Sequence, residues 1–89
     1  MADLRLLKVG NLVKVGWDDA ASHDDGWQER EEIINGVQHC TTVGFVVKRD
    51  RKQVVVAMSY GVHPHDGKEH YCTTWAIPTG WITKVEIIL

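Results

Sequence analysis

Residues 42–59 read TVGFVVKRDRKQVVVAMS and contain the clearest structural signal in the chain. Two runs rich in β-branched residues, at 42–47 and 53–59, flank a segment in which every residue is charged. This arrangement predicts a β-hairpin with a charged tip. The second run has three consecutive valines at 54–56 and therefore does not alternate between apolar and polar residues. Both faces of the hairpin are expected to be covered, either inside a barrel or by a second subunit.

Three further strands are expected outside this hairpin. In residues 12–17, Val13, Val15 and Trp17 recur with a period of two, which is typical of a strand with one buried face. Residues 71–77 alternate in the same way, and Pro78-Thr79-Gly80 ends that strand because proline has no N–H to donate to a ladder. Residues 82–88 form the expected closing strand.

The remaining segments are expected to be loops and one short helix. Residues 18–26 and 60–70 are polar and rich in turn formers. Between them, Trp27–Asn35 has a composition that suits a helix of two turns. Asp25 is positioned to cap its start, and Asn35-Gly36 suits its end.

With 89 residues, of which 44% are hydrophobic, the chain is expected to form a single domain over residues 1–89. Five short strands and one short helix predict a mainly β protein, specifically a small five-stranded barrel of the SH3-like or Sm-like type. A domain of this size has a marginal core, and such domains often gain stability from a partner subunit. We therefore expect a homo-oligomer.

Composition and charge disfavour several classes of function. The net charge of −2 disfavours a dedicated nucleic-acid binder, which normally has a large basic excess. No apolar run approaches the roughly 18 residues that a membrane-spanning helix needs. The first ten residues include Asp3 and Arg5 and do not resemble a secretory signal. We therefore expect the protein in the cytoplasm, with Cys40 and Cys72 as free thiols.

Two stretches resemble known kinds of protein. The ending Ile77-Pro78, a short turn and the strand Ile82–Leu89 resemble the closing segment of Sm-like barrels. Trp17-Asp18-Asp19-Ala20 and Gly26-Trp27, taken with the valine-rich hairpin and the Ile-Pro ending, resemble small uncharacterised bacteriophage proteins. This resemblance covers residues 12–89. It implies a phage origin and a small barrel in the cytoplasm of an infected bacterial cell, and it suggests no particular activity.

The aromatic and charged residues near the loops suggest a ligand site. Aromatic rings can stack on a nucleobase, and arginine can hold a phosphate. We therefore expect a non-enzymatic protein that sequesters a small nucleotide-like molecule, such as a host defence signal, at subunit interfaces. The expected binding residues are Trp17, Asp18, Trp27, Arg49, Arg51, Ser59 and Tyr60. Packing in the core or between subunits is the alternative role for the aromatic residues.

Two other functions stay open at this point. The acidic residues of segment 18–32 could form a surface that inhibits a host protein, although charged runs usually face solvent. Zinc could be bound by His63, His65, His70 and Cys72, which are suitable ligand types, but their spacing matches no standard zinc motif. No catalytic constellation is expected, because neighbours such as His39 and Cys40 point to opposite faces of a strand.

Overall fold

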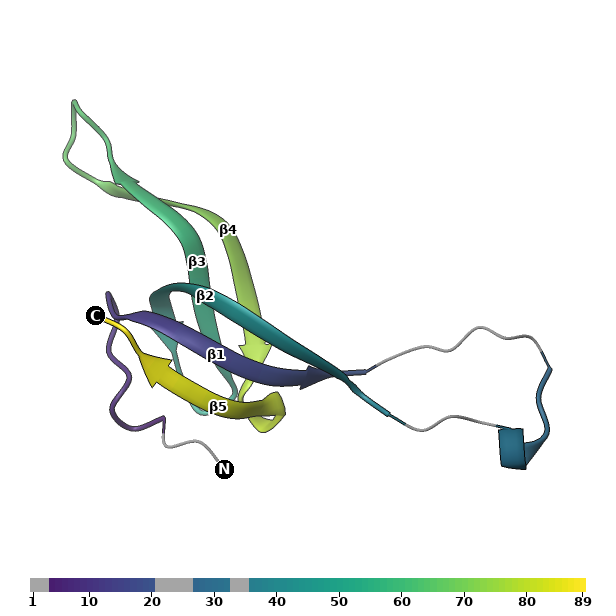
Figure 1. Cartoon of the computed structure of the whole chain (residues 1–89). Helices are drawn as coiled ribbons and strands as arrows, with labels where there is room; N and C mark the ends of the chain where they lie inside the picture. Colours follow the sequence, from purple (N-terminus) through teal and green to yellow (C-terminus); the bar gives the residue numbers. More distant parts are fainter. Residues whose placement is uncertain (1–3, 21–26, 33–35) are drawn as a thin grey trace.

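In a computed structural model, the chain forms one antiparallel sheet of five strands in the order β4-β3-β2-β1-β5 (Figure 1). The structure describes residues 4–20, 27–32 and 36–89. Its elements are β1 (Leu12–Asp19), η1 (Arg30–Glu32), β2 (Gln38–Arg49), β3 (Gln53–Val62), β4 (Glu69–Pro78), η2 (Thr79–Trp81) and β5 (Ile82–Ile87). All five expected strands are therefore confirmed, and the protein is mainly β.

Strand β1, which lies between β2 and β5, shows why the sheet has a buried face. Val13, Val15 and Trp17 are buried, whereas the intervening Lys14 is exposed, as the period of two predicts. Strand β1 pairs with β2 on one side, from Leu12 opposite Phe45 to Asp19 opposite Gln38. It pairs with β5 on the other side. Its backbone groups therefore have partners along both edges.

The hairpin of β2 and β3 has the predicted charged tip. The Asp50 carboxylate accepts hydrogen bonds from the backbone N–H groups of Lys52 and Gln53, at 2.7 and 3.0 Å. These two hydrogen bonds lower the pKa of Asp50 below its usual value, because they favour the ionised carboxylate. Of the consecutive valines, Val54 and Val56 are fully buried and Val55 is half-buried. One face of this strand therefore faces the core. The predicted cover over the opposite face is incomplete within one chain, because Val55 stays half-buried.

The hairpin of β3 and β4 is longer than the sequence suggested. Residues 60–70 were expected to be a loop, but Tyr60 pairs with Tyr71 and Val62 pairs with Glu69. Only residues 63–68 form the turn, in which Gly67 adopts a φ of 69°. The polar composition of this segment was misleading, because a projecting hairpin needs no apolar alternation to form its backbone hydrogen bonds.

The prediction of a two-turn helix over Trp27–Asn35 is wrong for residues 27–32, the part of this segment that the structure describes. Only a single 3₁₀ turn, η1, forms there, and it buries none of its side chains. An isolated helix this short is unstable in water, since most helical stability comes from packing an apolar face. The proposed cap Asp25 and residues 33–35 lie outside the described residues.

The sheet has two free ends and is not closed. Strands β4 and β5 are its outer strands, and no pairing joins them in the described part of the chain. The core lies on the curved inner face, where Val46, Val54, Val56, Ile77 and Ile82 pack with the buried residues of β1 and with Leu7. Figure 1 shows the β3–β4 hairpin projecting from one side and the ends of β1 and β2 extending from another. Among the described residues, no helix is long and apolar enough to cross a membrane.

Candidate functional site

Three tryptophans from different elements meet at one end of the core. The ring of Trp17 on β1 lies 6.3 Å from the ring of Trp75 on β4 and 6.3 Å from that of Trp81 in η2. The planes of Trp17 and Trp81 differ by only 14°, so these two rings are stacked. The Trp17 indole N–H also donates to the Thr42 hydroxyl at 3.0 Å. We call these three residues the tryptophan cluster.

The members of the tryptophan cluster differ in exposure, and this decides what each can contact. Trp17 is 8% exposed and belongs to the core, so its face is not accessible to a ligand. Trp75 and Trp81 remain 46% and 42% exposed. Trp17 therefore acts as the support for two exposed rings. The sequence did not select these two rings as ligand residues, because packing in a small core or between subunits was the role expected for them.

A hollow of about 320 Å³ adjoins Trp81. It is lined by Trp81, the carboxylates Asp18 and Asp19, and by Ala20, Val37, Gly80 and Thr83. Asp18 follows the buried Trp17 directly at the end of β1, and η2 brings Trp81 to the same end. The hollow therefore combines one aromatic face with several oxygen acceptors.

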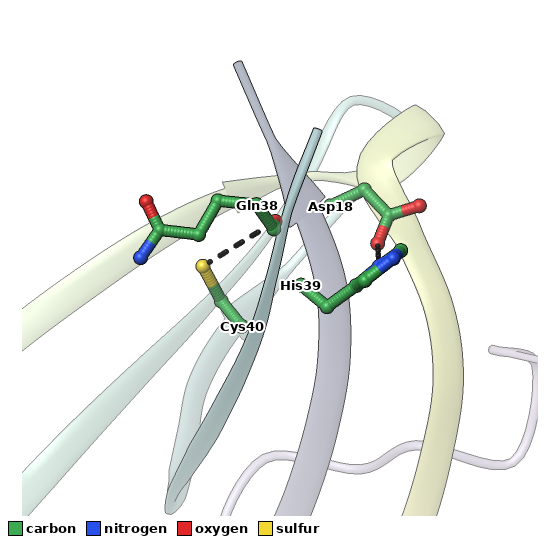
Figure 2. A network of polar contacts seen from close by, with 4 residues as sticks. All are labelled: Asp18, Gln38, His39 and Cys40. Atoms are coloured by element: carbon green, nitrogen blue, oxygen red, sulfur yellow. Dashed lines mark hydrogen bonds and ion pairs between the residues drawn. The ribbon is translucent and has the colours of Figure 1, made fainter. Parts of the chain in front are cut away.

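Asp18 also contacts a histidine on the neighbouring strand. Asp18 and His39 are directly opposite in the pairing of β1 and β2, and the Asp18 carboxylate lies 2.5 Å from His39 Nδ1. Figure 2 shows these side chains pointing toward one another, whereas Cys40 lies toward the Gln38 carbonyl. His39 and Cys40 therefore point to different sides of β2, as predicted, and they do not form a catalytic pair.

The other predicted ligand residues lie elsewhere. Arg49 is at the far end of β2, where its guanidinium donates to the Leu4 carbonyl at 2.6 Å, and Arg51 is exposed in the following turn. Trp27 is fully exposed next to η1. Ser59 and Tyr60 lie on the projecting β3–β4 hairpin. One chain therefore does not bring the predicted residues into a single site.

The predicted zinc ligands lie on this same projecting hairpin. The His63 ring is 5.5 Å from the rings of both His65 and His70. Cys72 is exposed and lies 3.6 Å from the Thr73 hydroxyl. Within residues 4–20, 27–32 and 36–89, no group of three or more histidine, cysteine, aspartate or glutamate residues is arranged to hold a metal ion. The geometry therefore gives zinc binding no support.

A second pocket, of about 190 Å³, lies where the β3–β4 hairpin leaves the core. Its lining includes three aromatic residues and one carboxylate, Phe45, Tyr60, Tyr71 and Glu69, together with Val9, Gly10 and Val46. Of these residues the sequence singled out only Tyr60. The missing signal was the strand extension itself, because pairing Tyr60 with Tyr71 places both rings on one face.

Comparison with known proteins identified no matching protein-family model, no similar curated protein and no similar solved structure.

Proposed function

We propose that this is a non-enzymatic binding protein that forms a homo-oligomer and sequesters a small nucleotide-like molecule at its subunit interfaces. The observation that carries the proposal is the exposed ring of Trp81, held by Trp17 beside a hollow that contains Asp18 and Asp19. The resemblance to bacteriophage proteins suggests the biological context. The captured molecule would be a signal of the host's defence, bound in the cytoplasm of the infected cell.

The tryptophan cluster suits a flat nitrogenous ring. Stacking of a base on an aromatic side chain contributes about 1–3 kcal/mol, and a rigid platform loses little entropy on binding. Trp81 is stacked on the buried Trp17, so its orientation is set before a ligand arrives. Asp18 and Asp19 offer acceptors for the amino group of a base or for ribose hydroxyls.

Phosphate would need a second subunit. Trp17 pairs with Cys40 on β2, and Arg49 lies nine residues further along that strand (49 minus 40). At about 3.3 Å per residue, this separation is roughly 30 Å. A head-to-tail contact would bring the exposed Arg51 of one subunit to the acidic hollow of the next. The positive charge of Arg51 and the negative charge of the acidic hollow, at opposite ends of the sheet, would also steer this contact.

The shape of the chain supports self-association. Its radius of gyration is 16.9 Å, whereas a compact chain of this length has one of about 12 Å. Large apolar side chains on the projecting hairpin, including Met58, Tyr60 and Val62, are more than half exposed. As part of the proposal, the curved sheet belongs to a small SH3-like or Sm-like barrel. The burial of Ile77 and Ile82 on either side of the η2 turn supports this assignment.

The first test is native mass spectrometry of the protein purified without chelator, before and after addition of AMP and ADP-ribose. We expect an oligomer that gains one of these masses. Trp81→Ala and Arg51→Ala should each reduce binding, whereas Lys84→Ala, a basic residue on β5 outside the hollow, should not. A bare monomer that binds neither compound would contradict the proposal and favour the acidic surface as an inhibitor of a host protein.

A subunit-mixing experiment tests the position of the site. If the base and the phosphate are held by different subunits, each interface needs one intact Trp81 and one intact Arg51. Mixed oligomers of Trp81→Ala and Arg51→Ala subunits should then regain part of the binding that each variant lacks. No recovery in oligomers shown by mass to be mixed would place the site within one chain and overturn the shared interface.

A further inference from the structure

The pocket at the base of the β3–β4 hairpin has the composition of a cation site. The Phe45 and Tyr60 rings meet edge to face, with their centres 4.9 Å apart and their planes at 87°. The Tyr71 ring lies 6.2 Å from Tyr60 and is tilted by 38°. Three aromatic rings at different angles therefore surround one small space, which also includes the Glu69 side chain.

Strand pairing explains why these residues come together. Tyr60 and Tyr71 are directly opposite on β3 and β4, and such pairs place their side chains on the same face of the sheet. Glu69 is two residues before Tyr71, so it lies on that face as well. The Tyr71 hydroxyl donates to the Glu69 carboxylate at 2.6 Å. This bond holds the carboxylate beside the rings and raises the pKa of Tyr71, so the phenol remains neutral and keeps its proton.

The electrostatics of the pocket favour one sign of charge. The face of an aromatic ring is electronegative and attracts cations within about 6 Å. Among the described residues that line the pocket, Glu69 is the only charged one. The formal charge of the pocket lining is therefore negative. A phosphate would be repelled here, which separates this pocket from any nucleotide site at the other end of the core. Tyr60 and Tyr71 are 51% and 38% exposed, so a ligand can reach the rings from solvent.

We propose that Phe45, Tyr60, Tyr71 and Glu69 form a binding site for an alkylated ammonium group, such as a nitrogen that carries three methyl groups. Methyl groups contact the ring faces, and the diffuse positive charge lies near Glu69. Water occupies about 30 Å³ per molecule in the liquid, so the pocket of about 190 Å³ has the space of about six waters. This space admits a compact quaternary ammonium head. The inference does not depend on nucleotide binding or on the oligomeric state.

The decisive experiment compares choline with 3,3-dimethylbutan-1-ol, which has the same shape but a carbon in place of the charged nitrogen. Both are titrated into the full chain, and the ring protons of Phe45, Tyr60 and Tyr71 are followed by NMR. We expect choline to bind about 5- to 30-fold more tightly than its neutral analogue, which is the range for a cation over partly desolvated rings. Equal affinity for the two compounds would overturn the proposal, as would the absence of ring shifts with choline.

Two variants separate the carboxylate from the rings. Glu69→Gln keeps the size of the side chain but removes the charge, and Tyr60→Ala removes the central ring. Each should weaken choline binding at least about 5-fold. The matched control is Glu86→Gln on β5, the edge strand on the opposite side of the sheet from β4. This change removes a carboxylate away from the pocket and should leave choline affinity unchanged. If Glu86→Gln weakens binding as much as Glu69→Gln, the effect is one of net charge and the pocket is not the site.

The source of the ammonium group is distinguished in the same assay. Blocked Nε-trimethyllysine presents the same head on a side chain, and choline presents it on a free small molecule. Tighter binding of the blocked amino acid would assign the site to a modified protein side chain. Tighter binding of choline would assign it to a small metabolite. Binding of neither would contradict the proposed site.

Discussion

Gly44 illustrates how a single position limits what the sheet can accommodate. It lies in β2, and a Cβ atom added there would be 2.6 Å from the Ala57 carbonyl oxygen and 3.1 Å from its carbon. Both atoms belong to the backbone, so they cannot move aside as the end of a side chain could. The close approach of β2 and β3 therefore requires glycine at this position.

We expect Gly44→Ala to lower the free energy of unfolding by about 1–3 kcal/mol, the usual cost of overpacking. The control is Gly61→Ala in β3, where the added Cβ meets nothing within 4 Å. That change should be neutral or slightly stabilising, because alanine loses less backbone entropy than glycine on folding. Urea denaturation of the two variants measures the difference. Equal free energies of unfolding for the two variants would show that β2 and β3 move apart enough to accommodate the Cβ atom without losing stability.

At the scale of the element, β4 contains an irregularity that regular strands do not show. Thr73 has a φ of 54°, a left-handed conformation that is unfavourable for a β-branched residue. The sequence offers no sign of it, since Thr73 and Thr74 are identical neighbours in the same strand. The pairing of β3 with β4 has partners at Thr74 and Cys72 but skips Thr73. This local departure lies between the part of the hairpin in the core and the part that projects.

We expect the two threonines to respond in opposite ways to replacement by glycine. Thr73→Gly relieves the left-handed strain, whereas Thr74→Gly only adds the entropy cost of glycine in a strand. The free energy of unfolding of Thr73→Gly should therefore exceed that of Thr74→Gly by about 1–2 kcal/mol. Thermal or urea unfolding of both variants provides the measurement. A lower stability for Thr73→Gly would mean that residue 73 adopts an ordinary strand conformation.

The whole molecule consists of a small core and a hairpin arm that adds little to it. Beyond Ala57 on β3 and before Ile77 on β4, every residue of the two strands is exposed. The buried cluster contains residues from all five strands but none from the outer part of this hairpin. The arm is therefore held by strand pairing and by surface contacts such as that of Tyr60 with Phe45, and not by buried side chains. Its exposed apolar side chains are available to another subunit.

We expect the core to fold without the arm. Replacing residues 60–71 by Asn-Gly would join the paired residues Ser59 and Cys72 through a two-residue turn. Circular dichroism should still show a cooperatively folded β protein, because no buried side chain is removed. In native mass spectrometry, the subunit number should fall if the arm forms the interface. An unfolded variant would show that the arm belongs to the core, and an unchanged oligomer would place the interface elsewhere.

The sequence by itself determined the strands that supply the core. Alternation in β1 indicated burial on one face, and that burial is a property of local pattern. The valine run in β3 indicated a strand, but its prediction that both faces are covered went further than one chain provides, since Val55 is only half-buried. The β2–β3 hairpin was predicted equally well, because two β-branched runs flank a short charged segment. The marginal helix was not, since its formation depends on packing that the chain does not provide.

Only the tertiary structure decided which side chains meet. Trp17 and Trp81 are 64 residues apart (81 minus 17), and only the placement of η2 at the end of β1 stacks their rings. The cation pocket likewise depends on the register that sets Tyr60 opposite Tyr71. The physical reason is that a sequence pattern reports whether a side chain is buried, whereas register and strand order determine its neighbours. A binding site depends on those neighbours.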